Sequence, residues 1–440
     1  MNRTTPEQQA RREKRQRRRQ PERRLVAVEM LFFFSAFLLI SLKERVDWMG
    51  IMLAFLVPAL IHFATIIIPR GFAADKLLMG IVNFLCALGV LILYSTDVEA
   101  GTTRGFQQAL YYGIGLVVMF FTSLLVCKVR RWDKLIWLLF VGSVGFIALP
   151  LVFGKEYQGA QNWIFVGGIS VQPSEAVKLA LVLLLSWFMS EQRLLPWLGF
   201  LGACMLILML QKDLGTALVY YATALILFYA NTGSLTLTGV GLAGAAGAAV
   251  VGYKMFHHVK NRVAAWQNPW SDYAGTGYQL AQVLMAIASG GLFGVGLGLG
   301  SPRVIPVYFT DCIFAVICEQ FGVLFGILTL ALYVIMILRG ISTAISARRS
   351  FYGLIAMGVT AMLGVQTFII IAGVLKMIPL TGVTMPFVSY GGSSLVSSMG
   401  LIGLLQGVST LNQKDLSYDY QMSRAALEPE QAEENRSFGR

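Results

Sequence analysis

The chain has 440 residues, of which 56% are apolar and only 13% are charged, and its formal net charge is +12. In soluble globular domains, about a quarter of the residues are charged. The composition therefore excludes a soluble globular protein and predicts an integral membrane protein. The positive charge does not indicate nucleic-acid binding, because much of it is concentrated in residues 1–24, which hold ten basic and three acidic side chains.

Residues 1–24 show no apolar periodicity and are predicted to form a disordered basic tail. Positively charged segments beside the first span stay on the cytoplasmic side of a membrane and are attracted to anionic lipids. We therefore expect a cytoplasmic amino terminus and contacts between this tail and membrane lipids.

Apolar runs of about 20 residues, long enough to cross a bilayer, recur along the chain and predict an all-α polytopic membrane protein with about 12 transmembrane helices. They lie near residues 25–42, 49–69, 76–95, 107–127, 134–153, 174–190, 195–211, 214–231, 236–256, 312–338, 351–373 and 391–410. An even number of spans returns the carboxyl terminus to the cytoplasm, and basic residues favour the connections that this topology leaves inside. Residues 411–440 are expected to be a disordered cytoplasmic tail.

This topology places four polar segments together outside the membrane, namely residues 154–173, 211–215, 257–311 and 376–394. The longest of them, 257–311, is a large extracytoplasmic loop between the ninth and tenth spans. Within it, residues 276–291 are predicted to form a short helix at the membrane surface. The glycine-rich residues 294–300 are predicted to be flexible backbone rather than a dinucleotide site.

Asp311 lies where the large loop meets the next apolar run. An ionisable group at the edge of the hydrocarbon region is a functional candidate. Aspartate also commonly caps the start of a helix. Position alone favours capping, and both interpretations stay open at this point.

Other charged residues stand at the ends of predicted spans. Glu175 and Lys178 are three residues apart on one helix face, where each can neutralise the other. An ion pair that only fixes helix packing and a direct contact with substrate are equally compatible with this spacing. Asp213 is interpreted as a helix cap in preference to a catalytic acid, and Trp163 is compatible with an ordinary interfacial aromatic residue.

The cysteine and histidine spacings indicate no metal site. The five cysteines all fall in or at the ends of apolar runs. The three histidines do not form a ligand cluster with them. We therefore expect neither a disulfide framework nor a protein-bound metal.

Five ordered motifs resemble the SEDS family (shape, elongation, division and sporulation: FtsW, RodA and SpoVE). They read QNWI..GG..VQPSEAVK, QKDLGTA, RVAAWQNPWSD..GTGYQLAQVLMAIASGGLFGVGLG, TDCIFAVICEQFG and PLTGVTMPFVSYGGSSL. The resemblance covers about residues 76–410. It implies a core of ten spans, to which residues 25–75 add two amino-terminal helices without changing the orientation of the core. The resemblance also implies that the protein is a peptidoglycan glycosyltransferase that polymerises lipid II.

The family's Thr-Asp motif falls on Thr310 and Asp311, and the resemblance implies that Asp311 is the catalytic carboxylate. The family's QPSE..K pair falls on Glu175 and Lys178, and the tryptophan of its RRWI motif falls on Trp163. The chain departs from the family in two places. It reads IPVYFTDC instead of LPEAHTDF, and it has Gln161 and Asn162 where arginines are usual.

The implied reaction explains why a carboxylate is needed. A sugar hydroxyl displaces undecaprenyl diphosphate with inversion at the anomeric carbon, so a carboxylate can accept the hydroxyl proton as general base. Cations must offset the charge that grows on the leaving diphosphate. The candidates are Lys178, Arg262 and Lys376, with a divalent cation such as Mg²⁺ as an alternative. Gln279 and Ser393, which lie in the matched motifs, complete the predicted substrate-binding residues.

The expected partners are lipid II, a class B penicillin-binding protein that supplies crosslinking, and membrane lipids, with no nucleic acid. The expected location is the bacterial cytoplasmic membrane, with both termini in the cytoplasm. Two alternatives remain from the sequence. One is a flippase or transporter of lipid II, because helical bundles with embedded charges are typical of transporters. The other is a non-catalytic scaffold of a cell-wall synthesis complex.

Overall fold

The structure is a computed structural model that describes residues 6–43, 46–71, 74–129, 131–157, 159–167 and 169–437. The amino-terminal half of the described chain consists of α1 (Pro6–Ser41), α2 (Trp48–His62) with a π-helical turn (Phe63–Ile67), α3 (Ile68–Gly71), α4 (Lys76–Ala100), α5 (Arg104–Lys128), α6 (Trp132–Phe153), α7 (Pro173–Ser190) and α8 (Leu194–Leu210). Between α6 and α7 lie β1 (Lys155–Tyr157), β2 (Ala160–Val166) and β3 (Ile169–Val171).

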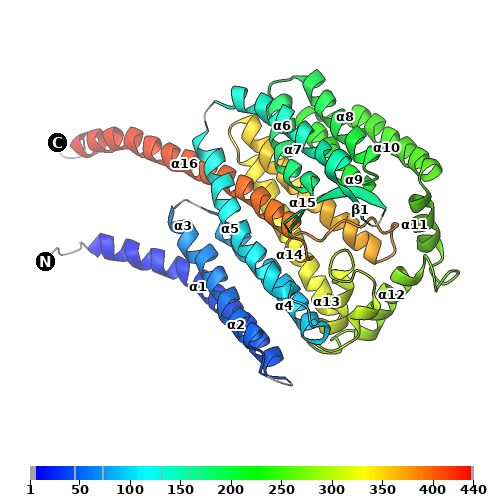
Figure 1. The fold of residues 1–440 in the computed structure, drawn as a ribbon. Coiled ribbons are helices and arrows are strands. Elements are labelled where there is room, and N and C mark those ends of the chain that lie inside the picture. Colours follow the sequence, from blue (N-terminus) through cyan, green and yellow to red (C-terminus); the bar gives the residue numbers. More distant parts are fainter. Residues whose placement is uncertain are drawn as a thin grey trace.

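The carboxyl-terminal half continues with α9 (Leu214–Thr232), α10 (Leu235–Met255), α11 (His257–Gln267), α12 (Tyr278–Gly290), a 3-10 turn (Pro302–Val304), α13 (Ile313–Phe321), α14 (Val323–Ile345), α15 (Ser350–Val374) and α16 (Gly392–Ser437). Figure 1 shows that α1 begins and α16 ends at the same end of the helical bundle. Helices α11 and α12 and the strands lie at the other end.

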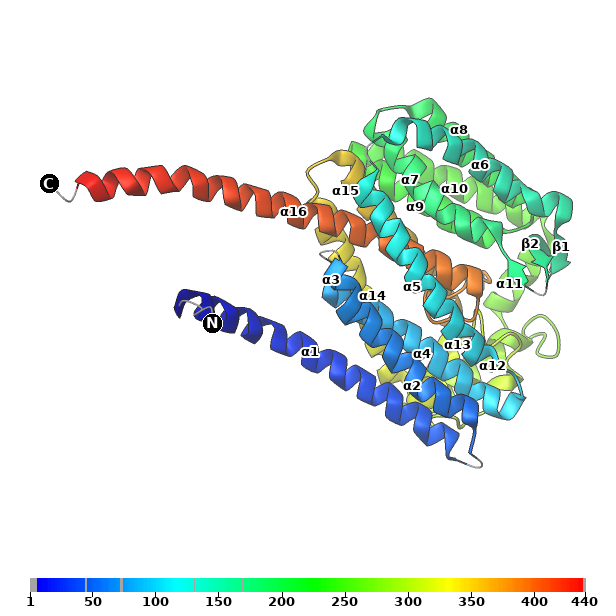
Figure 2. The same cartoon turned by 60° about the vertical axis from the view of Figure 1, so that its left-hand side comes forward.

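Eleven helices among the described residues are long and apolar enough to cross a membrane, and the shorter apolar helix α8 accounts for the twelfth expected span. The predicted polytopic helical fold is therefore confirmed. The membrane-spanning parts of α4, α7, α15 and α16 are mostly buried at the centre of the bundle, whereas α10 buries none of its residues. The two amino-terminal helices α1 and α2 pack on one flank against α4 and α5 (Figure 2).

The predicted start of the span at residues 312–338 is wrong. The helix is interrupted at Gly322, which separates α13 from α14. Gly322 has φ +86°, and a Cβ there would collide with the carbonyl oxygen of Leu292. Only glycine accepts both this backbone conformation and this close approach. The membrane span is α14, and α13 belongs to the large loop.

The segment between α6 and α7 forms a three-stranded antiparallel sheet in the order β1-β2-β3, which the all-helical prediction did not include. The amide of Gln161 in β2 donates to the carbonyl oxygen of Gln211, at 3.0 Å. This bond joins two of the segments that were expected to lie together outside.

The terminal segments differ from the expected disorder. Helix α1 begins at Pro6, within the basic tail, and α16 continues to Ser437, well past residue 410. Residues 6–24 are rich in Arg, Gln and Glu, and residues 411–437 in Glu, Gln and Ala, all of which have high helix propensity. Each helix also starts or ends as a continuation of a span that is already folded, so it needs no costly nucleation. Residues 1–5 and 438–440 lie outside the described residues.

Candidate functional site

A pocket of about 180 Å³ lies among the elements of the large loop and the loop before α16. Its lining residues are Asn261, Arg262, Ala265, Thr276, Gln279, Leu280, Asp311, Leu380 and Gly382. They come from α11, the turn before α12, α12 itself, the segment before α13 and the loop after α15. The pocket is therefore formed only when segments far apart in the sequence come together.

Asp311 is the carboxylate of this pocket. Its side chain is half-buried, and its Oδ1 accepts a hydrogen bond from Thr310 Oγ1 at 3.1 Å. Burial raises the pKa of Asp311 above its usual range, while bonds from Thr310 and Gln279 and the charge of Arg262 act in the opposite direction. A carboxylate with a raised pKa in a pocket is a candidate general base.

The capping interpretation of Asp311 is not supported by the geometry. The residue at the N-cap position of α13 is Cys312, and its side chain makes no capping bond. Asp213, in contrast, does cap α9, as expected. Its Oδ1 accepts from the amide of Thr216 at 3.1 Å, and its Oδ2 accepts from Asn162 Nδ2 at 2.7 Å.

Arg262 is the cation of the pocket. It lies on α11, and its Nη1 donates to the carbonyl oxygen of Thr381 at 2.7 Å. Gly382, with φ +74°, allows the two elements to approach, since a Cβ there would lie 3.3 Å from Arg262 Nη2. One N–H group of the guanidinium thus bonds to this loop, and its charge lines the pocket, where a guanidinium can attract an anion.

Gln279 links α12 to the segment that carries Asp311. Its Nε2 lies 3.3 Å from the carbonyl oxygen of Pro306 and 3.3 Å from Cys312 Sγ. Of the residues predicted from the sequence, the pocket therefore brings together Asp311, Arg262 and Gln279. Thr310 supports Asp311 from the neighbouring position.

Glu175 and Lys178 form a buried ion pair inside the bundle, outside the lining of this pocket. Lys178 Nζ donates to Glu175 Oε1 at 2.9 Å, to Glu175 Oε2 at 2.8 Å and to Gln366 Oε1 at 2.9 Å. Ser397 Oγ donates to Glu175 Oε2 at 2.9 Å. The ammonium has three hydrogens, and all three are used, so this geometry favours the packing role over a contact with substrate.

The remaining predicted substrate-binding residues also lie outside the pocket lining. Trp163 is in β2, opposite Lys155 of β1. Lys376 has φ +58° and uses its carbonyl oxygen to accept from Trp266 Nε1 at 3.0 Å. Ser393 is in the first turn of α16, and its hydroxyl is buried.

Sequence reasoning missed Asn261, Thr276 and Gly382. The signal for Gly382 was present, because a glycine in the loop sequence PLTGVTMP, two residues after Leu380 and three after a proline, marks a special backbone position. Nothing local distinguishes Asn261 or Thr276 from other polar loop residues.

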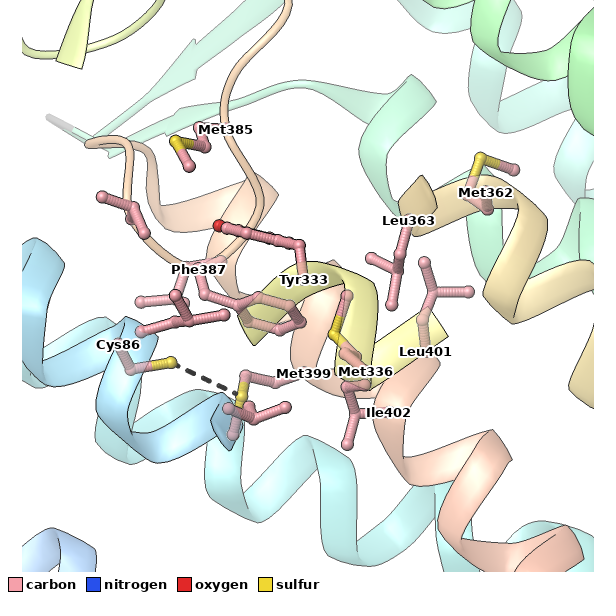
Figure 3. Close-up of a cluster of buried hydrophobic side chains, with 14 of the residues drawn as sticks. Cys86, Tyr333, Met336, Met362, Leu363, Met385, Phe387, Met399, Leu401 and Ile402 are labelled. Atoms are coloured by element: carbon pink, nitrogen blue, oxygen red, sulfur yellow. Dashed lines mark hydrogen bonds between the residues drawn. The ribbon is translucent and has the colours of Figure 1, made fainter. Parts of the chain in front are cut away.

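The loop that carries Gly382 is anchored in the protein core. Phe387 packs in the cluster of buried side chains shown in Figure 3, together with Tyr333, Met336 and Met399. Tyr333 Oη donates to the carbonyl oxygen of Pro386. The loop therefore provides a rigid wall for the pocket.

The chain is similar to known proteins over most of its length. A family model described as cell cycle protein, for FtsW, RodA and SpoVE, matches residues 75–414. The chain is 33% identical over 371 residues to the peptidoglycan glycosyltransferase RodA of Mycobacterium bovis, covering 77% of this chain and 79% of that protein. It is 35% identical over 355 residues to the stage V sporulation protein E of Bacillus subtilis, covering 76% and 96%.

Among solved structures, the chain resembles one from a peptidoglycan synthase complex that coordinates polymerisation and crosslinking. The TM-score is 0.64 and the identity 26%, over 77% of this chain and 98% of the other. The matched region begins at residue 75, just before α4, so α1 to α3 precede it. The chain belongs to the FtsW, RodA and SpoVE family of cell cycle proteins, the SEDS family whose motifs it carries.

Proposed function

We propose that this protein is a peptidoglycan glycosyltransferase that polymerises lipid II, with Asp311 as general base. The observation that carries the proposal is the juxtaposition of Asp311 and Arg262 across one pocket at the end of the bundle opposite the start of α1. Relatives of similar sequence are named peptidoglycan glycosyltransferases.

The chemistry needs both groups. The acceptor sugar hydroxyl attacks the anomeric carbon of the donor, the new glycosidic C–O bond forms, and the C–O bond to the diphosphate breaks with inversion. Asp311 accepts the hydroxyl proton. Arg262 stabilises the negative charge that develops on the departing lipid diphosphate.

A divalent cation could share the task of Arg262 only as a bridge to substrate. Among the described residues, no group of three or more His, Cys, Asp or Glu side chains is placed to hold a metal ion. Mg²⁺ is commonly bound by one or two carboxylates together with substrate phosphates. The single carboxylate Asp311 and a lipid diphosphate fit that arrangement.

The test is polymerisation of purified lipid II by the purified protein, alone and with a candidate class B penicillin-binding protein. We expect glycan ladders on gels. The partner is proposed because a similar chain belongs to a complex that couples polymerisation and crosslinking. Absence of polymer with every tested partner would contradict the enzymatic proposal and favour the scaffold or flippase alternatives.

Lipid-linked substrate must reach the pocket from one side of the membrane, so the orientation of the chain is part of the proposal. With both termini in the cytoplasm, the exposed Ser271 of the large loop lies outside and the exposed Ser346 after α14 lies inside. In a variant without native cysteines, Ser271→Cys should be labelled in intact cells by a membrane-impermeant thiol reagent. Ser346→Cys should be labelled only after permeabilisation, and the reverse pattern would contradict the proposed orientation.

A further inference from the structure

The residues just before Asp311 are held by a side chain outside the pocket lining. Arg104 is the first residue of α5, and its guanidinium lies 4.0 Å from the ring centre of Phe309. Its Nη1 also donates to Tyr308 Oη at 3.2 Å. A guanidinium over an aromatic face is attracted by the ring quadrupole, and the attraction grows when both are withdrawn from water.

The same turn of α5 also holds the loop before α16. Gln108 Nε2 donates to the carbonyl oxygen of Ser389 at 2.9 Å. Gln107 Oε1 accepts from Tyr390 Oη. Residues three and four apart share one helix face, so Arg104, Gln107 and Gln108 together form one contact surface of α5.

The two segments held by α5 are also bonded to each other. The amide of Tyr390 donates to the carbonyl oxygen of Phe309 at 2.8 Å, and Ser389 Oγ donates to that of Thr310. The rings of Phe309 and Tyr390 meet edge to face, with centres 5.9 Å apart. The backbone on both sides of Thr310 is therefore fixed from outside the pocket.

The first turn of α5 is itself rigidly placed. Its Gly105 amide donates to Asp97 Oδ2 at 2.6 Å. A Cβ on Gly105 would lie 2.7 Å from the backbone nitrogen of Tyr94, so α5 and α4 are in backbone contact there. Movement of the Arg104 backbone would require this tight helix contact to open.

The backbone before Asp311 is strained. Val307 has φ +54°, a conformation that β-branched residues rarely adopt. Such strain persists only where surrounding contacts impose it. Tyr308 and Phe309 stand where the SEDS pattern has alanine and histidine. Arg104 contacts the ring of Phe309 and the hydroxyl of Tyr308.

We propose that Arg104 is a positioning residue for Asp311 and acts through Phe309 and Tyr308. The inference rests on the proposed function and adds a residue to it. Arg104 does not line the pocket, so it is not a catalytic residue. Because small misplacement of a catalytic group lowers the rate of the chemical step more than substrate binding, loss of Arg104 should affect kcat and spare KM.

The experiment compares Arg104→Ala with Arg193→Ala. Arg193, the N-cap residue of α8, lies 5.2 Å from the ring centre of Trp187, near the end of α7 remote from the sheet. It is a control for loss of a cation over an aromatic ring. We expect Arg104→Ala to lower kcat for lipid II about tenfold, a change between those of an exposed and a desolvated cation–π contact, because Arg104 and Phe309 are both half-buried. KM should stay within about twofold of the wild-type value. In Arg193→Ala, both kcat and KM should equal those of the wild type.

Three further variants separate positioning from a loss of fold. Phe309→Leu removes the aromatic face. The kcat of the double variant Arg104→Ala, Phe309→Leu should be no lower than that of the slower single variant. The conservative variant Arg104→Lys, which keeps the charge, should recover part of the rate. Additive losses in the double variant would overturn the proposal.

Amide hydrogen exchange gives a readout that does not depend on activity. In Arg104→Ala, exchange should accelerate in a peptide covering residues 305–312 and stay unchanged in α9 and α15. Unchanged exchange at 305–312 would overturn the positioning role. If the wild-type protein makes no polymer, the proposed function fails, while exchange still tests the contact.

Discussion

Asp311→Asn should fold, insert and bind its partner normally, yet polymerise lipid II about 10²–10⁴-fold more slowly, the usual contribution of a general base. Asparagine keeps the shape of the side chain and can still accept from Thr310, but it cannot take a proton. Rates should be measured on purified protein with a matched melting temperature. Near wild-type polymerisation by Asp311→Asn would remove the catalytic assignment.

The pH dependence provides a control for this assignment. The general base works as the carboxylate, so activity falls as the pH drops through its pKa. Burial raises the pKa of Asp311, and Arg262 opposes the rise. Arg262→Ala should therefore raise the pKa further and move the acidic limb of the rate profile to higher pH, whereas Arg262→Lys should move it less. Arg104→Ala should leave the midpoint unchanged. A limb that moves to lower pH in Arg262→Ala would contradict the assignment.

Lys178→Met should destabilise the protein by roughly 3–5 kcal/mol, the cost of an unpaired buried charge. Glu175 would keep the bond from Ser397 but lose both bonds from the ammonium. The double variant Glu175→Leu, Lys178→Met should recover part of the loss, because it removes both charges. Recovery should be incomplete, since Gln366 also loses a donor. The measurement is thermal or denaturant unfolding in detergent or nanodiscs.

The exposed pair of Lys212 and Glu156 is a matched control. Its closest N–O distance is 3.5 Å, and both side chains are about half exposed or more. Such surface pairs contribute at most about 1 kcal/mol, so Lys212→Met should unfold almost as wild type does. If Lys178→Met instead unfolds normally and loses polymerisation, Lys178 would have a direct role toward substrate, and the packing assignment would be wrong.

Features that depend on local sequence could be predicted. Hydrophobic runs specify spans because each helix must satisfy its own backbone in lipid. The pairing of Glu175 with Lys178 follows from the helical repeat, and the cap of Asp213 follows from its place before α9. These interactions link residues within one helical turn, so the order of residues alone determines them.

Features that depend on contacts between distant segments were decided only by the tertiary structure. The break at Gly322 requires the backbone of Leu292 nearby, and without that contact residues 312–338 look like one apolar span. Asp311, Arg262 and Gly382 come from three separate segments, and Arg104 reaches Phe309 from α5. Hydropathy and helical periodicity carry no information about which loops meet at one end of a bundle, because that depends on how the helices pack.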